Sequence, residues 1–270
     1  MQKKKMLKTV LCHLENLNKN MFEWGVFVKN FALVQAIGTF VLLLYMIILW
    51  GLPLVPALAV FDYLECYGDG QSQIITYLIT AFSVVIAFLT YIHGLLLFSG
   101  LNQRLLHVRV SEGKKIAPLH SWMTVRWAVC GQLHRATWPV LSHVIPSPIA
   151  NYYYRLAGAK IGKKVQINTV GLNDPGMMRI EDNVVVGGAA VINGHIVEKG
   201  QLILSPITFK KGSLIGSRAT IQPGVVVGEG SVVATNALVA KWKVIPDGEV
   251  WGGLPAKCIR ENSDRPESDE

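Results

Sequence analysis

Two long stretches of the chain lack charge, and each predicts a helix that crosses a membrane. Residues 31–61 contain no charged side chain, and residues 70–103 contain one histidine, His93, and no charge. A helix needs about 20 apolar residues to cross the hydrocarbon core of a bilayer. We therefore expect spans over residues 31–50, where Gly51-Leu52-Pro53 ends the first helix, and over about residues 74–98. Together they predict a transmembrane helical hairpin over residues 31–100.

The second half of the chain repeats an aliphatic residue every six positions. A short strand alternates its two faces, so a strand followed by a tight corner presents one inward side chain on each side of a triangular prism. Gly, Asn and Asp at the corners supply the required backbone conformation. The pattern predicts an all-β parallel β-helix over residues 151–260. The inward anchors are Ile203, Phe209, Ile215, Ile221, Val227, Val233 and Val239 in one phase, and Ile161, Ile167, Ile180, Val186 and Ile192 after phase slips.

Two other segments carry apolar residues at helical spacing. We expect amphipathic juxtamembrane helices at the inner leaflet over residues 1–30 and 101–150, and packing against the soluble domain is the alternative. Residues 261–270 are acidic and lack apolar anchors, which predicts a disordered tail. The two stripes are Met6, Leu7, Val10, Leu11, Leu14, Leu17 and Met21, and Trp122, Val125, Val129, Leu133, Ala136 and Val140.

Composition excludes an ordinary soluble globule, and charge sets the topology. Of the 270 residues, 51% are hydrophobic and only 16% are charged, whereas soluble domains are about a quarter charged. The net charge of +8 gathers on either side of the hairpin, while the loop between the spans holds acidic residues and no Lys or Arg. The positive-inside rule then places both termini and the soluble domain in the cytoplasm, as expected of an integral protein of the bacterial inner membrane. Basic residues interleaved with aromatics are missing from the soluble domain, so we expect no nucleic-acid partner.

One segment of the repeat region carries a candidate catalytic residue. Residues 193–201 fit the six-residue period poorly, so we expect them to leave the coil as a loop. They contain His195, the only histidine after residue 143. A neutral imidazole is the usual general base for an alcohol or amine nucleophile, although composition alone favours a surface histidine without a role. The four cysteines lack zinc-binding spacing, and we expect no metal site.

The repeat, the loop with one histidine and the segment Val250-Trp251-Gly252-Gly253-Leu254-Pro255-Ala256-Lys257 resemble the left-handed β-helix (hexapeptide-repeat) acyltransferases. The resemblance covers about residues 158–260. It implies a homotrimer that binds acyl-CoA, expected to be acetyl-CoA, between neighbouring prisms, with His195 as the base. Carried over by position, the resemblance implies that Ser217 and Ala219 contact the pantetheine of the cofactor. It implies that Thr235 and Lys241 lie at the next coil edge of the cofactor site, and that Lys257 lies near the nucleotide phosphates. Thr235-Asn236-Ala237 and Trp242 depart from the family pattern, which leaves the acyl donor open.

A second resemblance extends further toward the N-terminus. The segments Pro118-Leu119-His120-Ser121-Trp122 and Tyr154-Arg155-Leu156-Ala157-Gly158-Ala159-Lys160-Ile161-Gly162 are similar to the membrane-embedded terminal region of non-ribosomal poly-lysine synthetases. Those enzymes join paired membrane helices to three tandem prisms in one chain, which a homotrimer of this chain would rebuild. The resemblance implies a different chemistry, amide formation from an aminoacyl thioester on a carrier.

Three functions therefore remain open at the level of sequence. In the leading hypothesis, a membrane-anchored acyltransferase uses His195 to deprotonate a hydroxyl or amine acceptor, and Asp174 orients the imidazole. The alternatives are an aminoacyl-condensing enzyme and a non-catalytic trimeric scaffold. The bilayer and a small-molecule, lipid-linked or carrier-bound acceptor are the expected partners, and nothing in the repeat identifies that acceptor.

Overall fold

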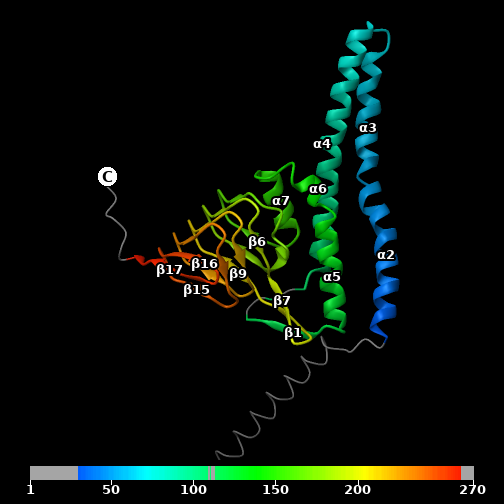
Figure 1. The fold of residues 1–270 in the computed structure, drawn as a ribbon. Coiled ribbons are helices and arrows are strands. Elements are labelled where there is room, and N and C mark those ends of the chain that lie inside the picture. The colour runs from blue at the N-terminus through cyan, green and yellow to red at the C-terminus, as the bar shows by residue number, and fades with distance from the viewer. Residues whose placement is uncertain (1–29, 109, 111–112, 263–270) are drawn as a thin grey trace, which may run out of the picture.

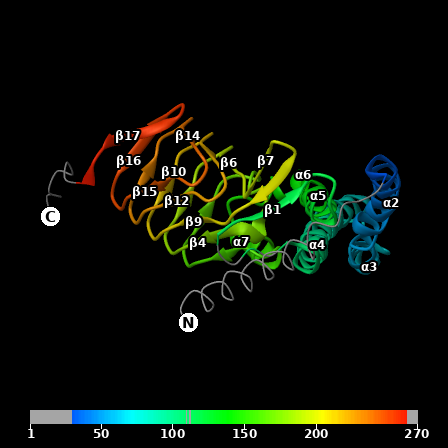
Figure 2. The ribbon, with the colours of Figure 1, turned by 90° about the horizontal axis from the view of Figure 1, so that it is seen from below.

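The computed structural model describes residues 30–108, 110 and 113–262. They form a helical hairpin and a three-sided β-helix that lies against its lower half (Figure 1; Figure 2). The helix expected over residues 1–30, and the acidic tail apart from residues 261 and 262, lie outside the described residues.

The two charge-free stretches are both helical. The first arm contains α2 (Phe31–Gly51), α3 (Leu54–Glu65) and the short 3-10 helix η1 (Cys66–Gly68), and the second arm is α4 (Gln73–Leu106). At 38 and 34 residues, the two arms are long and apolar enough to cross a membrane. Beyond the β-helix they project together (Figure 1).

The first helix ends at the predicted break, because α2 ends at Gly51, and a second helix, α3, begins directly after it at Leu54. A proline lacks the N–H that a first turn leaves unpaired, so it is tolerated where a helix starts. Pro53 precedes α3 with a helical φ of −66°. A Cβ added to Gly94 of α4 would lie 3.1 Å from the Cβ of Pro53. The interruption is therefore a packed joint within one long arm.

The segment after the hairpin forms one strand and three helices: β1 (Lys115–Pro118), α5 (Trp122–Arg135), α6 (Trp138–Leu141) and α7 (Pro148–Leu156). Ser121 caps α5 by accepting the N–H of Thr124, and Ser147 caps α7 in the same way. The sequence left two environments open for this segment, the inner leaflet and the protein interior. Met123 and Leu133 are buried, so α5 packs partly against the protein interior. Because α7 crosses residue 150, the first coil starts later than the expected boundary at residue 151.

The β-helix consists of three parallel sheets of short strands, in which each strand pairs with strands of the neighbouring coils. Sheet 1 contains β2 (Lys160–Ile161), β4 (Met178–Ile180), β9 (Ile207–Phe209), β12 (Val226–Val227) and β15 (Val244–Ile245). Sheet 2 contains β3 (Gln166–Ile167), β5 (Val185–Val186), β10 (Leu214–Ile215), β13 (Val232–Val233), β16 (Val250–Gly253) and the antiparallel β17 (Ala256–Arg260). Sheet 3 contains β6 (Val191–Ile192), β11 (Thr220–Ile221) and β14 (Leu238–Val239).

The six-residue period is confirmed as the origin of the core. The anchors from Ile215 to Val239 all have 0% exposed surface, as do Ile167, Val186, Ile192 and Phe209. Ile203 is an exception, because it lies in a strand outside the coils. The left hand expected for the coil stays a prediction.

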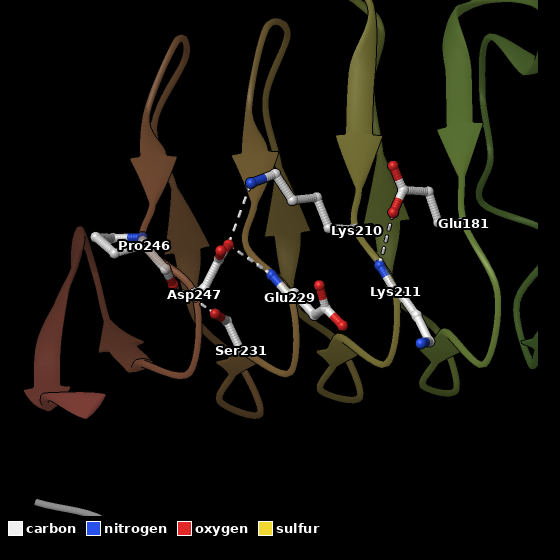
Figure 3. Close-up of polar contacts among 7 residues, drawn as sticks. All are labelled: Glu181, Lys210, Lys211, Glu229, Ser231, Pro246 and Asp247. Carbon is white, nitrogen blue, oxygen red and sulfur yellow. Dashed lines mark hydrogen bonds and ion pairs between the residues drawn. The ribbon is translucent and has the colours of Figure 1, made fainter. Parts of the chain in front are cut away.

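Polar bonds at the corner between sheets 1 and 2 tie successive coils together (Figure 3). Asp247 accepts hydrogen bonds from the backbone N–H of Glu229 at 2.8 Å and from Lys210 Nζ at 3.2 Å. These bonds lower the pKa of the Asp247 carboxyl. Nearer the helices, between the coils of β4 and β9, Glu181 accepts the N–H of Lys211 at 3.0 Å. This corner is therefore held by carboxylates that bond to the backbone.

The segment with His195 leaves the coil as predicted, and it forms a β-hairpin. Strands β7 (His195–Glu198) and β8 (Gln201–Leu204) pair antiparallel, and β1 pairs with the other edge of β8. At the turn, Lys199 and Gly200 have φ of 48° and 74°, the left-handed pair that a tight two-residue hairpin turn requires. The hairpin emerges at the corner between sheets 3 and 1, which we call the hairpin corner.

A buried polar network joins the helices to one another. The hydroxyl of Tyr153 in α7 accepts from Gln103 in α4 at 2.7 Å and lies 2.8 Å from Nδ1 of His134 in α5. Burial lowers the pKa of His134 to about 4 and raises the pKa of Tyr153 to about 12. The hydroxyl of Tyr154 donates to the carbonyl of Thr169 in the first coil, so α7 links the helical hairpin to the β-helix.

Candidate active site

His195 and Asp174 form a hydrogen-bonded pair at the base of the hairpin. Nδ1 of His195 lies 2.6 Å from Oδ2 of Asp174. The Asp174 side chain is 9% exposed and the His195 side chain 26%, so solvent reaches the imidazole while the carboxylate is almost enclosed. Sequence analysis selected both residues, and the structure brings them together across 21 positions of chain.

The coil geometry explains this meeting. Asp174 precedes the 3-10 helix η2 (Pro175–Met177), which occupies the hairpin corner one coil before His195. Gly194 permits the approach, because a Cβ there would lie 2.6 Å from Met177 and 3.1 Å from the Cβ of Asp174. The two coils are also bridged by the amide of Asn173, which donates to Asn193 Oδ1. Both members of the pair are thus fixed by neighbouring turns of one β-helix.

Trp127 of α5 completes the cluster, and the sequence analysis missed its role. Its Nε1–H donates to Oδ1 of Asp174 at 2.9 Å, and its ring centroid lies 4.6 Å from that of His195. Asp174 therefore accepts one bond on each oxygen. The signal available in sequence was a tryptophan just off the apolar stripe of residues 101–150, which does not indicate a partner.

The arrangement sets which imidazole nitrogen is available for chemistry. An ionised carboxylate is only an acceptor, so Nδ1 carries the proton in its bond to Asp174. Nε2 then has a lone pair, and within the described residues it makes no hydrogen bond. A half-buried imidazole held in this tautomer is suited to accept a proton from a substrate.

The residues expected to bind the acyl donor lie in three places. Ser217 and Thr235 are exposed at the corner between sheets 2 and 3, in successive coils, and Asn236 N donates to the Ser217 carbonyl. Ala219 lies inside the coil with 0% exposed surface, its N–H donates to Gly216 and its carbonyl accepts from Val191. Neither its side chain nor its N–H is therefore presented at the surface.

Lys241 and Lys257 lie apart from that corner. Lys241 is at the hairpin corner, where its Nζ binds both carboxylate oxygens of Glu198 at the end of β7 and lies 5.1 Å from the ring centroid of Trp242. It is thus linked to the strand that His195 begins. Lys257 is exposed on β17, opposite Gly252 of β16. In the described part of the chain, no group of three or more His, Cys, Asp or Glu side chains could hold a metal ion.

Comparison with known proteins supports the repeat. Residues 211–241 match the model of the family described as the hexapeptide repeat of succinyl-transferase. A curated relative, the delta-poly-L-ornithine synthetase of Acinetobacter baumannii, is 29% identical over 157 residues. The match covers 58% of this chain and 12% of that protein, so the chain corresponds to a small part of the relative.

The solved structures that resemble the chain include acetyltransferases. A hexapeptide-repeat-containing acetyltransferase from Vibrio cholerae, complexed with acetyl coenzyme A, is 23% identical with a TM-score of 0.40, over 49% of this chain and 89% of that one. A maltose O-acetyltransferase from Clostridium difficile is 16% identical with a TM-score of 0.42, over 61% of this chain and 96% of that one.

Proposed function

We propose that the protein is a membrane-anchored acyltransferase that moves an acyl group, expected to be acetyl, from acyl-CoA to a hydroxyl or amine. The observation that carries the proposal is the His195–Asp174 bond at a hairpin leaving a β-helix. The match of residues 211–241 to a transferase repeat supports the same class.

The proposed reaction uses His195 twice. Nε2 takes the proton of the acceptor while the acceptor oxygen or nitrogen attacks the thioester carbonyl. The imidazolium then returns that proton to the leaving thiol, so the base is regenerated. Asp174 is a positioning residue that holds the Nδ1–H tautomer and stabilises the imidazolium, and Trp127 positions Asp174.

The acyl donor is proposed to lie along sheet 3. Exposed Ser217 and Thr235 border one edge of that sheet, and Lys241 borders the other. A lone lysine is a point charge that suits a phosphate group, which is the role proposed for Lys257. A homotrimer would supply a second prism opposite sheet 3, and this assembly is part of the proposal.

The membrane anchor is proposed from the two apolar arms and the distribution of charge, with the β-helix on the cytoplasmic side of a bacterial inner membrane. Two exposed cysteines offer a direct test: Cys66 lies in η1, at the far end of the first arm, and Cys258 lies on β17. In intact spheroplasts, a membrane-impermeant maleimide should label Cys66, and Cys258 should react only after permeabilisation. Labelling of Cys258 in intact spheroplasts would reverse the orientation.

A second candidate function rests on the relative in Acinetobacter baumannii. That protein's name describes poly-ornithine synthesis, and the same His195 base would serve an amine that attacks an aminoacyl thioester on a carrier. The two enzyme hypotheses differ in the donor, since only the first requires CoA.

One titration separates these functions. With purified full-length protein, we expect acetyl-CoA to raise the melting temperature and to release free thiol in the presence of acceptor amines or alcohols. His195→Ala should abolish thiol release while leaving the thermal shift in place. No thermal shift at millimolar CoA would rule out the leading proposal and favour the carrier thioester. If the His195→Ala variant retains the cellular phenotype of the wild type, the non-catalytic scaffold is the hypothesis that remains.

A further inference from the structure

A groove with apolar walls lies between the first membrane arm and α5. It has a volume of about 720 Å³, and we call it the α2–α5 groove. Phe31, Gly38 and Met46 of α2 line one wall along its length, and Ala128 lies in the other wall, on α5. The rings of Phe31, the first residue of α2, and His120, just before α5, contact at a centroid distance of 4.7 Å. The two helices therefore start at the same end of the groove and run side by side (Figure 1).

Contacts with α4 give the level at which the groove ends. The hydroxyl of Tyr45 in α2 donates to Asn102 of α4 at 2.7 Å. Nearly one turn closer to the turn between the arms, Ser99 of α4 donates to the carbonyl of Leu133 in α5 at 3.2 Å. The upper end of the α2 wall is thus level with the C-terminal end of α5.

The bilayer is expected to begin above that level. Gln132 and Arg135 at the end of α5 are exposed, and a charged side chain is costly to place in hydrocarbon. The β-helix lies beside the same lower half of the helical hairpin (Figure 1). Residues 49–68 of the first arm lie above the groove, and they are about as many as a helix needs to cross the hydrocarbon core. The groove therefore lies outside the lipid tails, on the side of the β-helix.

The surface around the groove is too apolar to face water alone. Leu33, Ile37 and Phe40 of α2 are each more than half exposed. Small residues leave the groove itself open, because a Cβ added to Gly38 would meet nothing within 4 Å. An exposed apolar patch with a hollow at its centre is typical of a docking site.

The segment that precedes the groove matches it in length. Residues 6–21 carry apolar side chains at helical spacing, and as a helix they would span about 22 Å. The α2 wall from Phe31 to Met46 covers the same number of residues. Residues 22–30 join the two stretches at the lower end of the groove, so a reversal of the chain there brings the segment alongside α2. A short tether of this kind gives an effective concentration in the millimolar range.

We propose that residues 6–21 dock as an amphipathic helix in the α2–α5 groove of the same chain, antiparallel to α2. The apolar side chains fill the space beside Gly38 and Ala128, and Lys8 and Lys19 on the opposite face of the helix stay in water. The inference rests on the membrane anchor of the proposed function, which sets the depth of the groove, and not on the catalytic step. A second copy of the chain and lipid tails are the competing occupants.

Cysteine crosslinking tests the proposal. The full-length protein, with its native cysteines replaced by alanine, carries Leu14→Cys in the middle of the apolar stripe and Ala128→Cys in the middle of the α5 wall. Membrane vesicles that contain this protein are treated with a short bismaleimide. We expect a crosslinked product of monomer mass, whose tryptic digest joins residues 9–19 to residues 127–135.

Asn16→Cys, combined with Ala128→Cys, is the matched control for the face of the helix. Residue 16 is about 200° from residue 14 around a helix, so docking turns it away from α5, although its tether is almost the same. A docked helix should crosslink at residue 14 and not at residue 16. A segment without a fixed position should crosslink at both.

Two glycines of α2 provide a matched pair for the groove. Gly38→Phe fills it, whereas Gly51→Phe enlarges a residue of the same helix that does not line it, and at both positions an added Cβ meets nothing within 4 Å. Both changes remove a glycine from a helix, so neither is expected to destabilise it. Gly38→Phe should abolish the crosslink between residues 14 and 128, and Gly51→Phe should leave it unchanged.

Contrary results separate the alternatives. Equal crosslinking at residues 14 and 16, or a crosslink that persists in Gly38→Phe, would overturn the proposal. A product of dimer mass would assign the groove to a second copy, and no crosslink at residue 14 would leave it to lipid tails, so either result also overturns docking. Extraction of the same vesicles with alkaline carbonate tests the anchor separately. Release of a protein that still forms the monomer-mass crosslink would contradict the anchor and support the docking.

Discussion

Replacing Asp174 by asparagine tests how the candidate site holds its imidazole. The change keeps the size of the side chain and removes its charge. The amide introduced by Asp174→Asn can turn its NH₂ toward Nδ1 of His195, which would stabilise the tautomer that carries its proton on Nε2. In that tautomer Nε2 has no lone pair to accept a proton, so we expect a loss in kcat with little change in KM for either substrate.

The size of the loss follows from the bond that is removed. The Nδ1–Oδ2 distance is 2.6 Å and the carboxylate is 9% exposed, so the bond is charge-assisted and shielded from water. Hydrogen bonds to charged groups contribute about 1.5–3 kcal/mol. Each 1.36 kcal/mol corresponds to a factor of about ten in rate, so kcat should fall about 10- to 150-fold.

The assay is thiol release from acetyl-CoA with saturating acceptor, supported by ¹⁵N spectra of histidine-labelled protein that report the tautomer of His195. Asp247→Asn is the control, because Asp247 also accepts two hydrogen bonds in the β-helix and lies at a different corner. Asp174→Glu should recover part of the rate. A kcat within twofold of the wild type for Asp174→Asn, when His195→Ala is inactive, would refute the positioning role.

Four further outcomes are expected. Trp127→Phe keeps the aromatic contact and loses the N–H donor to Asp174, so kcat should fall about tenfold; an unchanged kcat would make the indole a packing residue. Lys257→Ala should raise the KM for acetyl-CoA by up to about fivefold at constant kcat, since the side chain is exposed. Gly187→Ala places a Cβ 2.6 Å from Ser217 N, whereas the nearest atom for Gly188→Ala is at 3.9 Å, so only the former should lower the free energy of unfolding, by about 1–3 kcal/mol in denaturant titrations. The pKa of buried His134 is lowered to about 4, so below pH 6.5 the unfolded chain binds a proton that the folded chain does not, and stability should fall by about 3 kcal/mol between pH 6.5 and 4; melts of His134→Gln should lack this part of the pH dependence.

Much of the fold was predictable because its physics is local and periodic. One aliphatic anchor per six residues encodes the coil, and Val227 and Val233 fall on the buried face wherever the period is unbroken. Ile203 matches the six-residue phase only by coincidence, because it lies in β8, an antiparallel hairpin strand whose other edge pairs with β1. The break at Gly51-Leu52-Pro53 was predictable, but the new helix at Leu54 was not, because a proline that ends one helix also suits the start of the next.

The candidate site was predictable only as far as the coils carry it. His195 and Asp174 lie at one corner in successive turns, so the repeat itself brings them together. Trp127 arrives from α5, and its position depends on how α5 packs against the β-helix and α4, which no period in the sequence encodes. The pairing of Lys241 with Glu198 was likewise hidden, because it requires the length and register of the β7–β8 hairpin.

The buried network around Tyr153 explains how α5 can be placed accurately enough for its indole to meet Asp174. Gln103 of α4 and the pair His134 and Thr137 at the end of α5 converge on one hydroxyl. Leaving a buried polar group without its partner costs about 1–3 kcal/mol. A shift of α5 along α4 would break these bonds together. The helical hairpin therefore fixes α5, and Trp127 of α5 fixes the Asp174 carboxylate that orients His195. The candidate site thus depends on the helices as well as on the β-helix, which is why we expect an isolated β-helix to lose the positioning of Asp174 even where its coils fold.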